Sequence, residues 1–199
     1  MKKVYNITAY DCDCFYFDDE LSDDFFCKKC SQYIGKEPYY PKKLSIKPSK
    51  IKFGFCAPYD SDQLISQEVK EFFEEWGVEN VRFIQINTKP PVYAVEIGNI
   101  LEVDIEKSKY EAEGTLRFEE YCDQCHRYAA IAGTDIFFKD LDQLDPRQIY
   151  RTDIEFGGTS LKYPDSNQRM QKSPLWIVGE DLAKELKKRF KRLDVEKIS

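Results

Sequence analysis

Four cysteines, arranged in two C-x-x-C pairs, are the best candidates for metal binding or redox chemistry in this sequence. The pairs are Cys27-Lys-Lys-Cys30 and Cys122-Asp-Gln-Cys125. A C-x-x-C turn presents two sulfur atoms at its tip, and structural zinc is commonly bound by four thiolates in a tetrahedron. The pairs lie much further apart in the chain than the roughly 15–20 residues of compact zinc ribbons. We therefore predict one structural Zn²⁺, held by Cys27, Cys30, Cys122 and Cys125, that joins distant segments.

Other uses of these thiols remain open. The stretch from Cys122 to His126 also matches C-x-x-C-H, the attachment motif of c-type haem. However, His126 is the only histidine and the chain has two methionines, so axial ligands are scarce. Haem would also leave the first pair unexplained. A redox dithiol requires a helix that begins at the pair, and residues 127–131 make a poor helix start. Unliganded cysteines or disulfides are the remaining alternatives.

The other three cysteines, Cys12, Cys14 and Cys56, belong to no ligand pattern, and we expect them to be buried or free. His126 is expected to be a polar neighbour of the second pair, able to replace one thiolate only if Cys125 is not used. Seven cysteines are an odd number, diluted through a medium-sized chain, unlike the dense pairs of small secreted scaffolds. The cysteine count therefore favours a reducing cytoplasm.

The sequence contains no pattern typical of an enzyme active site. A single histidine leaves no base for a Ser-His or Cys-His pair, and no G-x-S-x-G frames a nucleophile. Gly157-Gly158 has neither the G-K-[ST] ending nor the G-x-G-x-x-G spacing of a phosphate-binding loop. Carboxylates are abundant, but none is singled out by its spacing. We expect a protein that is not an enzyme.

Two amphipathic helices stand out among the elements that must position the cysteines. In residues 66–76, Val69, Phe72, Phe73 and Trp76 recur at helical spacing, Ser66 can cap the first turn, and Gly77 ends the helix. The second helix is expected at residues 180–193. Strands are expected at residues 4–9, 81–86, 92–96, 100–105, 116–121, 131–138 and 175–178, and residues 140–173 are expected to be rich in loops. The sequence thus predicts a single α+β domain over residues 1–199, with mixed or antiparallel strands, two main helices and a pair of zinc knuckles. Residues 25–32 and 118–128 would form this zinc-ribbon-like element.

The surroundings of the two helices resemble each other. Residues 64–69 and 177–182 share an apolar pair, a small capping residue and an acidic first turn. Residues 78–81 and 195–198 follow the two helices with a similar pattern. Any capped amphipathic helix shares half of these features, so coincidence is the alternative to a structural repeat.

The net charge of the chain indicates which kind of partner it can bind. A net charge of −6 disfavours binding to phosphate backbones, so nucleic acid is an unlikely partner and a basic protein is favoured. The one basic stripe is the face of the second helix, for which a solvated surface is the simpler interpretation. The N-terminus lacks the apolar stretch of a signal peptide, and no run approaches the roughly 20 apolar residues of a membrane span. We expect a cytoplasmic protein without a membrane segment.

The order of these motifs resembles the double-CXXCG motif proteins and, more loosely, bacterial immunity proteins of polymorphic toxin systems. The similarity covers the two C-x-x-C pairs, residues 64–83 and residues 175–183 with the helix that follows. The family's glycine after each second cysteine is replaced by Ser31 and His126; such a glycine normally occupies a turn of positive φ. The resemblance implies a cytoplasmic protein that neutralises a toxin by binding it. The alternative is a zinc-ribbon adaptor for another protein or for nucleic acid.

An acidic segment before the first knuckle is the predicted contact surface for a basic toxin domain. Residues 11–24 contain seven carboxylates and no basic residue, beside several aromatic rings. Buried aromatic anchors surrounded by charge suit a basic partner. The contacts that we single out are Asp18, Asp19, Asp23 and Asp24. The alternative is a solvated acidic loop whose aromatic residues belong to the core.

Overall fold

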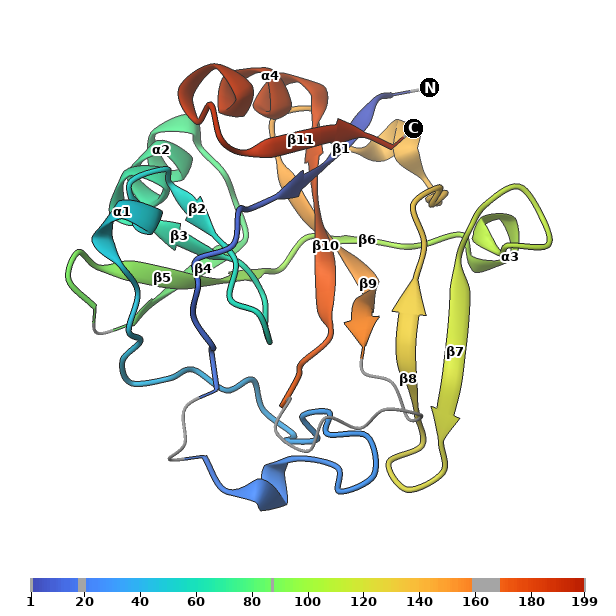
Figure 1. Cartoon of the computed structure of the whole chain (residues 1–199). Coiled ribbons are helices and arrows are strands. Elements are labelled where there is room, and N and C mark those ends of the chain that lie inside the picture. The colour runs from blue at the N-terminus through green and yellow to red at the C-terminus, as the bar shows by residue number, and fades with distance from the viewer. Residues whose placement is uncertain (1, 18–20, 87, 159–168, 199) are drawn as a thin grey trace.

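Two β-sheets form the framework of the protein (Figure 1). The computed structural model describes residues 2–17, 21–86, 88–158 and 169–198. Within these residues the larger sheet has the order β11-β1-β10-β9-β8-β7, with β6 parallel to β9 and all other pairs antiparallel. Its strands are β11 (Asp194–Lys197), β1 (Val4–Thr8), β10 (Ser173–Gly179), β9 (Ile149–Gly158), β8 (Arg127–Ala132), β7 (Arg117–Cys122) and β6 (Ile100–Leu101).

The smaller sheet is antiparallel throughout and has the order β2-β3-β5-β4. Its strands are β2 (Phe55–Cys56), β3 (Leu64–Ser66), β5 (Val92–Ile97) and β4 (Val81–Ile86). The two long helices are α2 (Gln67–Trp76) and α4 (Glu180–Arg189); the short helical segments are α1 (Pro48–Ile51), α3 (Ile105–Ser108), η1 (Asp23–Phe25) and η2 (Leu141–Gln143). The predicted α+β fold with two main helices is confirmed.

Helix α2 forms where its capping and apolar residues predict it. The Ser66 Oγ accepts a hydrogen bond from the Val69 amide, which satisfies one of the free donors of the first turn. Val69, Phe72 and Phe73 are buried on one face. Gly77 then ends the helix in the left-handed conformation, with φ of 78°.

Helix α4 packs beside α2 over a shared core. Leu182, Ala183 and Leu186 are its buried residues, and it ends at Arg189, a few residues before the expected end at position 193. The chain leaves the helix through Phe190, whose ring centroid lies 5.7 Å from that of Phe72 in α2. This contact fixes the two helices relative to each other.

The predicted repeat appears as two units of the same topology. In one unit, β5 lies between β3 and β4, which α2 connects. In the other unit, β1 lies between β10 and β11, which α4 connects. The registers also agree, because the capping residues Ser66 and Gly179 lie opposite Val92 and Val4, and a tyrosine follows each valine. The middle strand follows β4 in the first unit, whereas the N-terminus supplies it in the second. The matching pairs Val92-Tyr93 and Val4-Tyr5 were missed in the sequence because this order differs.

The main error of the sequence-based prediction lies in residues 140–173. This segment was expected to be rich in loops, but it contains β9, a ten-residue strand inside the larger sheet. Ile149 and Thr152 are buried, whereas the charged Arg151, Asp153 and Glu155 conceal the strand in a hydropathy pattern. Pairing with β10 and β8 outweighs the low apolar content of β9.

Two smaller predictions also differ from the structure. Residues 100–105 divide between the short strand β6 and the start of α3. Residues 131–138 do not continue as a strand, since β8 occupies Arg127–Ala132 and the apolar side chains of Ile136 and Phe138 are buried in the loop that follows. No helix in the described part of the chain combines the length and the apolar character needed to cross a membrane.

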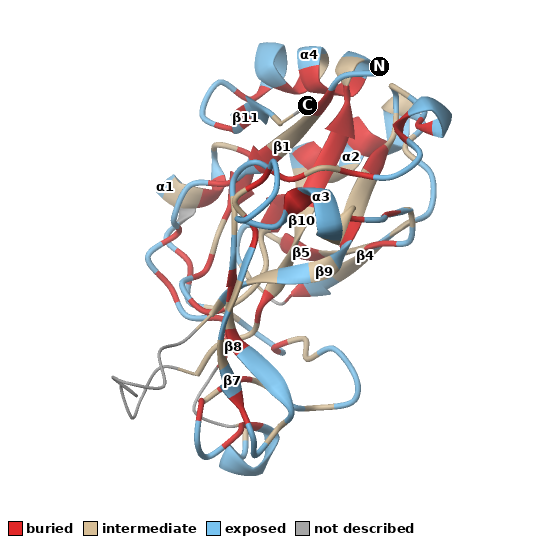
Figure 2. Ribbon diagram, turned by 90° about the vertical axis from the view of Figure 1, so that its right-hand side faces the viewer, coloured by how far each residue is buried: buried red, intermediate tan, exposed pale blue. Residues whose placement is uncertain are grey.

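The hairpin β7–β8 extends away from the well-buried body of the molecule (Figure 2). Its tip holds Cys122 and Cys125, and the turn that contains Cys27 and Cys30 lies beside it (Figure 1). Segments that are far apart in the chain therefore meet at this end of the molecule.

Candidate metal centre

The two C-x-x-C pairs come together as one cluster of four sulfur atoms. The Sγ atoms of Cys27 and Cys122 are 3.7 Å apart, those of Cys30 and Cys125 are 3.6 Å apart, and all four lie within 4.8 Å of one another. None of them forms a disulfide. A tetrahedral ion with metal–sulfur bonds of about 2.3 Å requires sulfur–sulfur distances of about 3.8 Å. The cluster therefore has the dimensions of a four-thiolate metal site.

The first knuckle is a tight turn held by its own backbone. The amide of Ser31 donates to the carbonyl of Cys27 at 2.8 Å, and the amide of Cys27 donates to the carbonyl of Gln32 at 2.9 Å. Phe26 and Tyr33 then pair as an antiparallel bridge on either side of the turn. The two thiols are buried at its tip.

The second knuckle repeats this construction at the tip of β7–β8. The amide of His126 donates to the carbonyl of Cys122 at 2.9 Å, Cys122 pairs with Arg127, and Tyr121 pairs with Tyr128. Both turns therefore have an aromatic residue before the first cysteine and a tyrosine three residues after the second. This shared pattern, aromatic-C-x-x-C-x-x-Tyr, is a further sequence signal of the knuckle pair, beyond the spacing of the cysteines.

Ser31 and His126 keep the backbone conformation that a glycine would favour. Each has φ of 57°, in the left-handed region that ordinary residues avoid. These are the two positions at which the resembled family has glycine. The turn geometry is thus retained in both knuckles although the glycine is missing from both.

Several polar contacts join one knuckle to the other. Gln32 is 1% exposed, and its Nε2 donates to the carbonyls of Tyr128 and Ala129 at 3.0 and 2.7 Å. The Lys29 ammonium lies 2.7 Å from a carboxylate oxygen of Asp123. The cluster is therefore supported by a hydrogen-bonded frame as well as by its four thiols. Gln32 was not predicted, because nothing in the sequence distinguishes it from a surface glutamine.

The charges around the cluster suit a metal with four thiolates. Such a site with a divalent ion carries a net charge of about −2, which nearby positive charge would offset. Lys172 is 8% exposed, donates to the carbonyl of Tyr128 at 2.6 Å and lies within electrostatic reach of Cys30 and Cys125. Burial lowers the pKa of Lys172, and the negative charges of Glu155 and, to a smaller extent, of Cys125 and Cys30 counteract this effect.

The thiols differ in how readily they lose their protons. Burial opposes ionisation of Cys122, but the backbone amides of Cys125 and Gln124 outweigh it and lower the pKa of this thiol to about 7. Burial raises the pKa of Cys30 and of Cys125. A metal ion must therefore displace protons from at least these two thiols, so its binding depends on pH.

His126 takes no part in the cluster. It is exposed, and its Nδ1 lies 3.5 Å from the hydroxyl of Tyr121. Cys122 and Cys125 face the first pair, an arrangement suited to one ion bound by four sulfurs. The second pair also leads into strand β8, so it lacks the helix start that a redox dithiol uses.

The remaining cysteines form a separate buried group, in agreement with the prediction that they are buried or free. Cys12, Cys14 and Cys56 are each less than a tenth exposed and belong to the core beneath the smaller sheet. The Sγ atoms of Cys12 and Cys14 lie 3.1 Å apart. Contact with Cys12 and burial raise the pKa of Cys14, so this thiol stays protonated.

The predicted partner surface is described only in part. Asp18 and Asp19 lie outside the described residues. Asp23 and Asp24 are exposed in the first turn of η1, which Ser22 caps, and Asp23 forms an ion pair of 2.7 Å with Arg169. Whether these carboxylates contact a partner stays a prediction.

The aromatic residues of the acidic segment divide between core and surface. Tyr16, Phe17 and Phe26 are buried, whereas Phe15 and Phe25 are 57% and 44% exposed. Most of these rings therefore belong to the core, as the alternative interpretation expected. Phe15 and Phe25 alone are available to a partner among these five.

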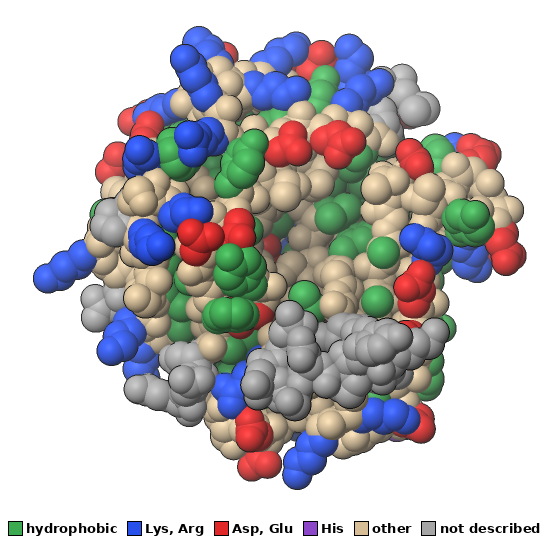
Figure 3. Space-filling model, viewed as in Figure 1, with side chains coloured by type: hydrophobic (Ala, Val, Ile, Leu, Met, Phe, Trp, Pro, Cys, Tyr) green, Lys and Arg blue, Asp and Glu red, His purple; other side chains and the backbone are tan. Residues whose placement is uncertain are grey.

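The basic residues of α4 lie on the surface among carboxylates. Figure 3 shows Lys and Arg side chains gathered over this helix. Lys184 pairs with Glu180 and Asp181, and Arg189 lies near Glu68 and Glu75 of α2. This pairing fits a solvated helix face better than a phosphate-binding stripe.

Comparisons of this chain with protein-family models, with curated proteins and with solved structures find no match.

Proposed function

We propose that this chain is a binding protein without enzymatic activity, which holds a structural zinc ion and neutralises a bacterial toxin by direct contact. The observation that supports a structural role for the metal is the closure of its site. Four thiols surround one position, and a tetrahedral ion bound by four protein ligands has no place for water or substrate. The ion would hold residues 25–32 against the hairpin β7–β8.

Zinc is the ion that this ligand set suits best. Thiolates are soft ligands, and a tetrahedral arrangement of four sulfurs favours zinc or iron. The lowered pKa of Cys122 supports metal binding near neutral pH, because one thiolate is available there before the ion arrives. Lys172 would offset part of the negative charge of the loaded site.

A basic toxin domain is the partner that the chain's charge and motif order favour. The resemblance to bacterial immunity proteins rests on the two C-x-x-C pairs and the segments around both main helices. A net charge of −6 would speed encounter with a basic protein and repel nucleic acid. Three basic residues of the α4 stripe, Lys184, Lys188 and Arg189, pair with carboxylates, which weakens the one basic surface that an adaptor for nucleic acid could use.

Capture of the partner followed by inhibition of its activity tests this function. The chain is used as bait in extracts of its native cell, and the bound proteins are identified by mass spectrometry. We expect a basic toxin domain, whose purified activity falls to zero at one equivalent of the chain. Capture of ribosomal or nucleic-acid components alone would contradict the immunity function and favour the adaptor. Inhibition by substoichiometric amounts would contradict neutralisation by binding.

A further inference from the structure

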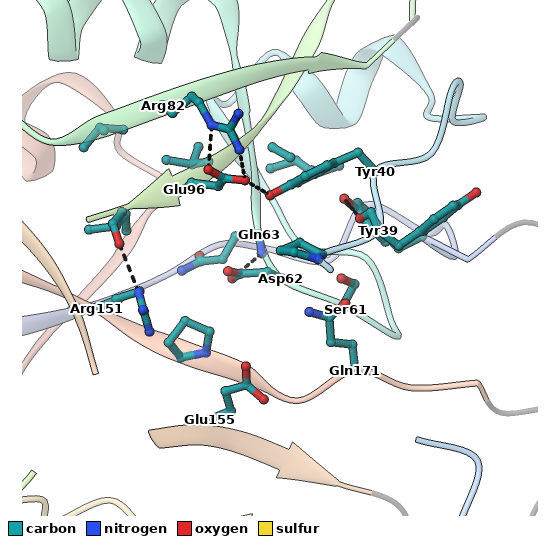
Figure 4. A pocket seen from close by; sticks show the side chains of 18 of the residues that line it. Tyr39, Tyr40, Ser61, Asp62, Gln63, Arg82, Glu96, Arg151, Glu155 and Gln171 are labelled. Atoms are coloured by element: carbon teal, nitrogen blue, oxygen red, sulfur yellow. Dashed lines mark hydrogen bonds and ion pairs between the residues drawn. The ribbon is translucent and has the colours of Figure 1, made fainter. Parts of the chain in front are cut away.

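A cleft of about 820 Å³ lies between the two sheets, away from the cysteine cluster. Strands β4 and β5 supply one side, and β9 with the start of β10 supplies the other. The segment around Tyr39 and Tyr40 and the turn before β3 complete its walls (Figure 4). This volume is typical of pockets that bind small molecules or side chains, which measure roughly 300–1,000 Å³.

Asp62, Glu155, Tyr39 and Tyr40 are among the side chains that line the same opening. Asp62 comes from the turn before β3, and Glu155 comes from the exposed outer part of β9 (Figure 4). Tyr39 and Tyr40 are half-buried and precede a proline. The segments that supply these four side chains are widely separated in the chain, and the packing of the two sheets brings them together.

The arginines of the cleft already have partners. Arg82 forms a two-pronged interaction with Glu96, whose carboxylate also accepts a hydrogen bond from the hydroxyl of Tyr40. The Nε of Arg151 donates to the carbonyl of Ile97 at 3.0 Å, and its Nη1 donates to the carbonyl of Thr152 at 3.3 Å. Neither guanidinium forms an ion pair with Asp62 or Glu155.

Asp62 and Glu155 lack a cationic partner among the described residues. The carboxylate of Asp62 accepts hydrogen bonds from two neutral donors, the amide of Gln63 at 2.7 Å and the indole Nε1 of Trp176 at 3.1 Å. The positive charges of Lys172, Arg127 and Arg151 act on Glu155 from beyond ion-pair distance. The cleft therefore contains two carboxylates that form no ion pair with a described residue, although three cations at longer range partly offset the charge of Glu155.

The pKa of Asp62 also indicates that its negative charge lacks a cationic partner. Burial raises the pKa of this carboxyl to about 7, although both neutral donors counteract the effect, and the charge of Glu155 adds to it. The ionised form of Asp62 is thus unfavourable while the cleft lacks a cation. A positive group between the two carboxylates would remove this penalty.

We propose that this cleft binds a guanidinium or ammonium group, held by Asp62 and Glu155 and flanked by the rings of Tyr39 and Tyr40. Carboxylates form charge-assisted hydrogen bonds to such groups, and aromatic rings attract them through their π faces. The remaining volume accepts the apolar body that bears the charge. The inference does not rest on the immunity function, because a free ligand or an arginine side chain of a partner could supply the group.

Trp176 offers a direct signal for binding, because its indole N–H contacts Asp62. The only other tryptophan, Trp76, donates to the carbonyl of Arg147 outside the cleft and serves as an internal control. The chain is titrated with N-acetylarginine amide and with an arginine-containing tetrapeptide while both indole resonances are recorded by NMR. We expect a saturable shift of the Trp176 resonance and a constant Trp76 resonance. Tighter binding of the peptide assigns the site to a protein side chain, and equal binding assigns it to a free ligand.

The controls separate charge recognition from general adhesion. N-acetylcitrulline amide has nearly the same shape without the charge and should leave Trp176 unchanged. Asp62→Asn and Glu155→Gln should each weaken binding at least about tenfold, because each removes one charged hydrogen-bond acceptor. Glu111→Gln removes the same charge from an exposed turn and should have no effect. An unchanged Trp176 resonance with both cationic probes, equal binding of citrulline, or unaltered affinity of the two cleft variants would overturn the proposal.

Discussion

Glycine at Ser31 and at His126 is expected to stabilise the metal-loaded protein. Both residues have φ of 57°, a conformation that costs an ordinary residue about 1–2 kcal/mol and costs glycine almost nothing. Glycine also has more conformational freedom in the unfolded chain, which reduces the gain in folding stability by about 0.5–1 kcal/mol. The expected net gain is about 0.5–1 kcal/mol for each substitution.

The side chains that these substitutions remove contribute little. The ring of His126 is exposed, and its contact with the Tyr121 hydroxyl is long at 3.5 Å. The knuckle uses the backbone of Ser31, through its amide and its carbonyl, and glycine keeps both groups. The gain from relieved backbone strain should therefore appear almost undiminished in each variant.

Thermal unfolding in the presence of excess zinc measures this gain. For a chain of this size, about 1 kcal/mol corresponds to a rise of about 2–4 °C in Tm. Ser31→Ala and His126→Ala retain a Cβ and should leave Tm nearly unchanged. Lys28→Gly, at an exposed knuckle position outside the positive-φ residues, should lower it. A fall in Tm for both glycine variants, or equal effects of glycine and alanine, would refute the explanation by backbone strain.

Three further predictions concern the frame, the cleft and the partner surface. Gln32→Ala should cost about 1–3 kcal/mol in chemical denaturation, because it removes the side-chain donor to the buried carbonyl of Ala129, whereas the exposed Gln124→Ala should cost little. Since the native pKa of Asp62 is raised from 3.8 to about 7, the native state holds a proton that the unfolded chain has lost, and stability falls as pH rises across this window. Asp62→Asn should remove that fall, worth a few kcal/mol at most, and an equally steep pH profile in the variant would contradict it. A variant with Asn in place of Asp18, Asp19, Asp23 and Asp24 should associate with the toxin more slowly at low salt and keep a nearly unchanged Tm. Unaltered association kinetics would place the contact elsewhere.

The elements that local residues determine were predicted well from the sequence. Ser66 and Gly77 mark the ends of α2 through capping, and β4 has the predicted limits of residues 81–86. Strand β9 was missed because Arg151, Asp153 and Glu155 alternate with its less polar residues. Its strand conformation follows from pairing with β10 and β8, which a hydropathy pattern does not contain.

The candidate sites also contain some residues that local sequence predicts and others that only the packing of distant segments brings together. The four clustered cysteines were predicted from the spacing of the two C-x-x-C pairs, since this motif determines a turn locally. Their supporting residues, Gln32 and Lys172, are of types that are usually exposed, and they are buried here because two distant turns meet. Asp62 and Glu155 could not be paired in advance, because the arrangement of the two sheets brings them to one cleft.

The metal content of the purified chain tests the central claim most directly. Protein produced in the presence of zinc and iron is dialysed against metal-free buffer, and its metals are measured by elemental analysis beside Cys122→Ser as the matched control. We predict close to one zinc per chain, lost together with much of the stability in Cys122→Ser. A well-folded wild-type chain without metal, or one that holds iron in place of zinc, would contradict it.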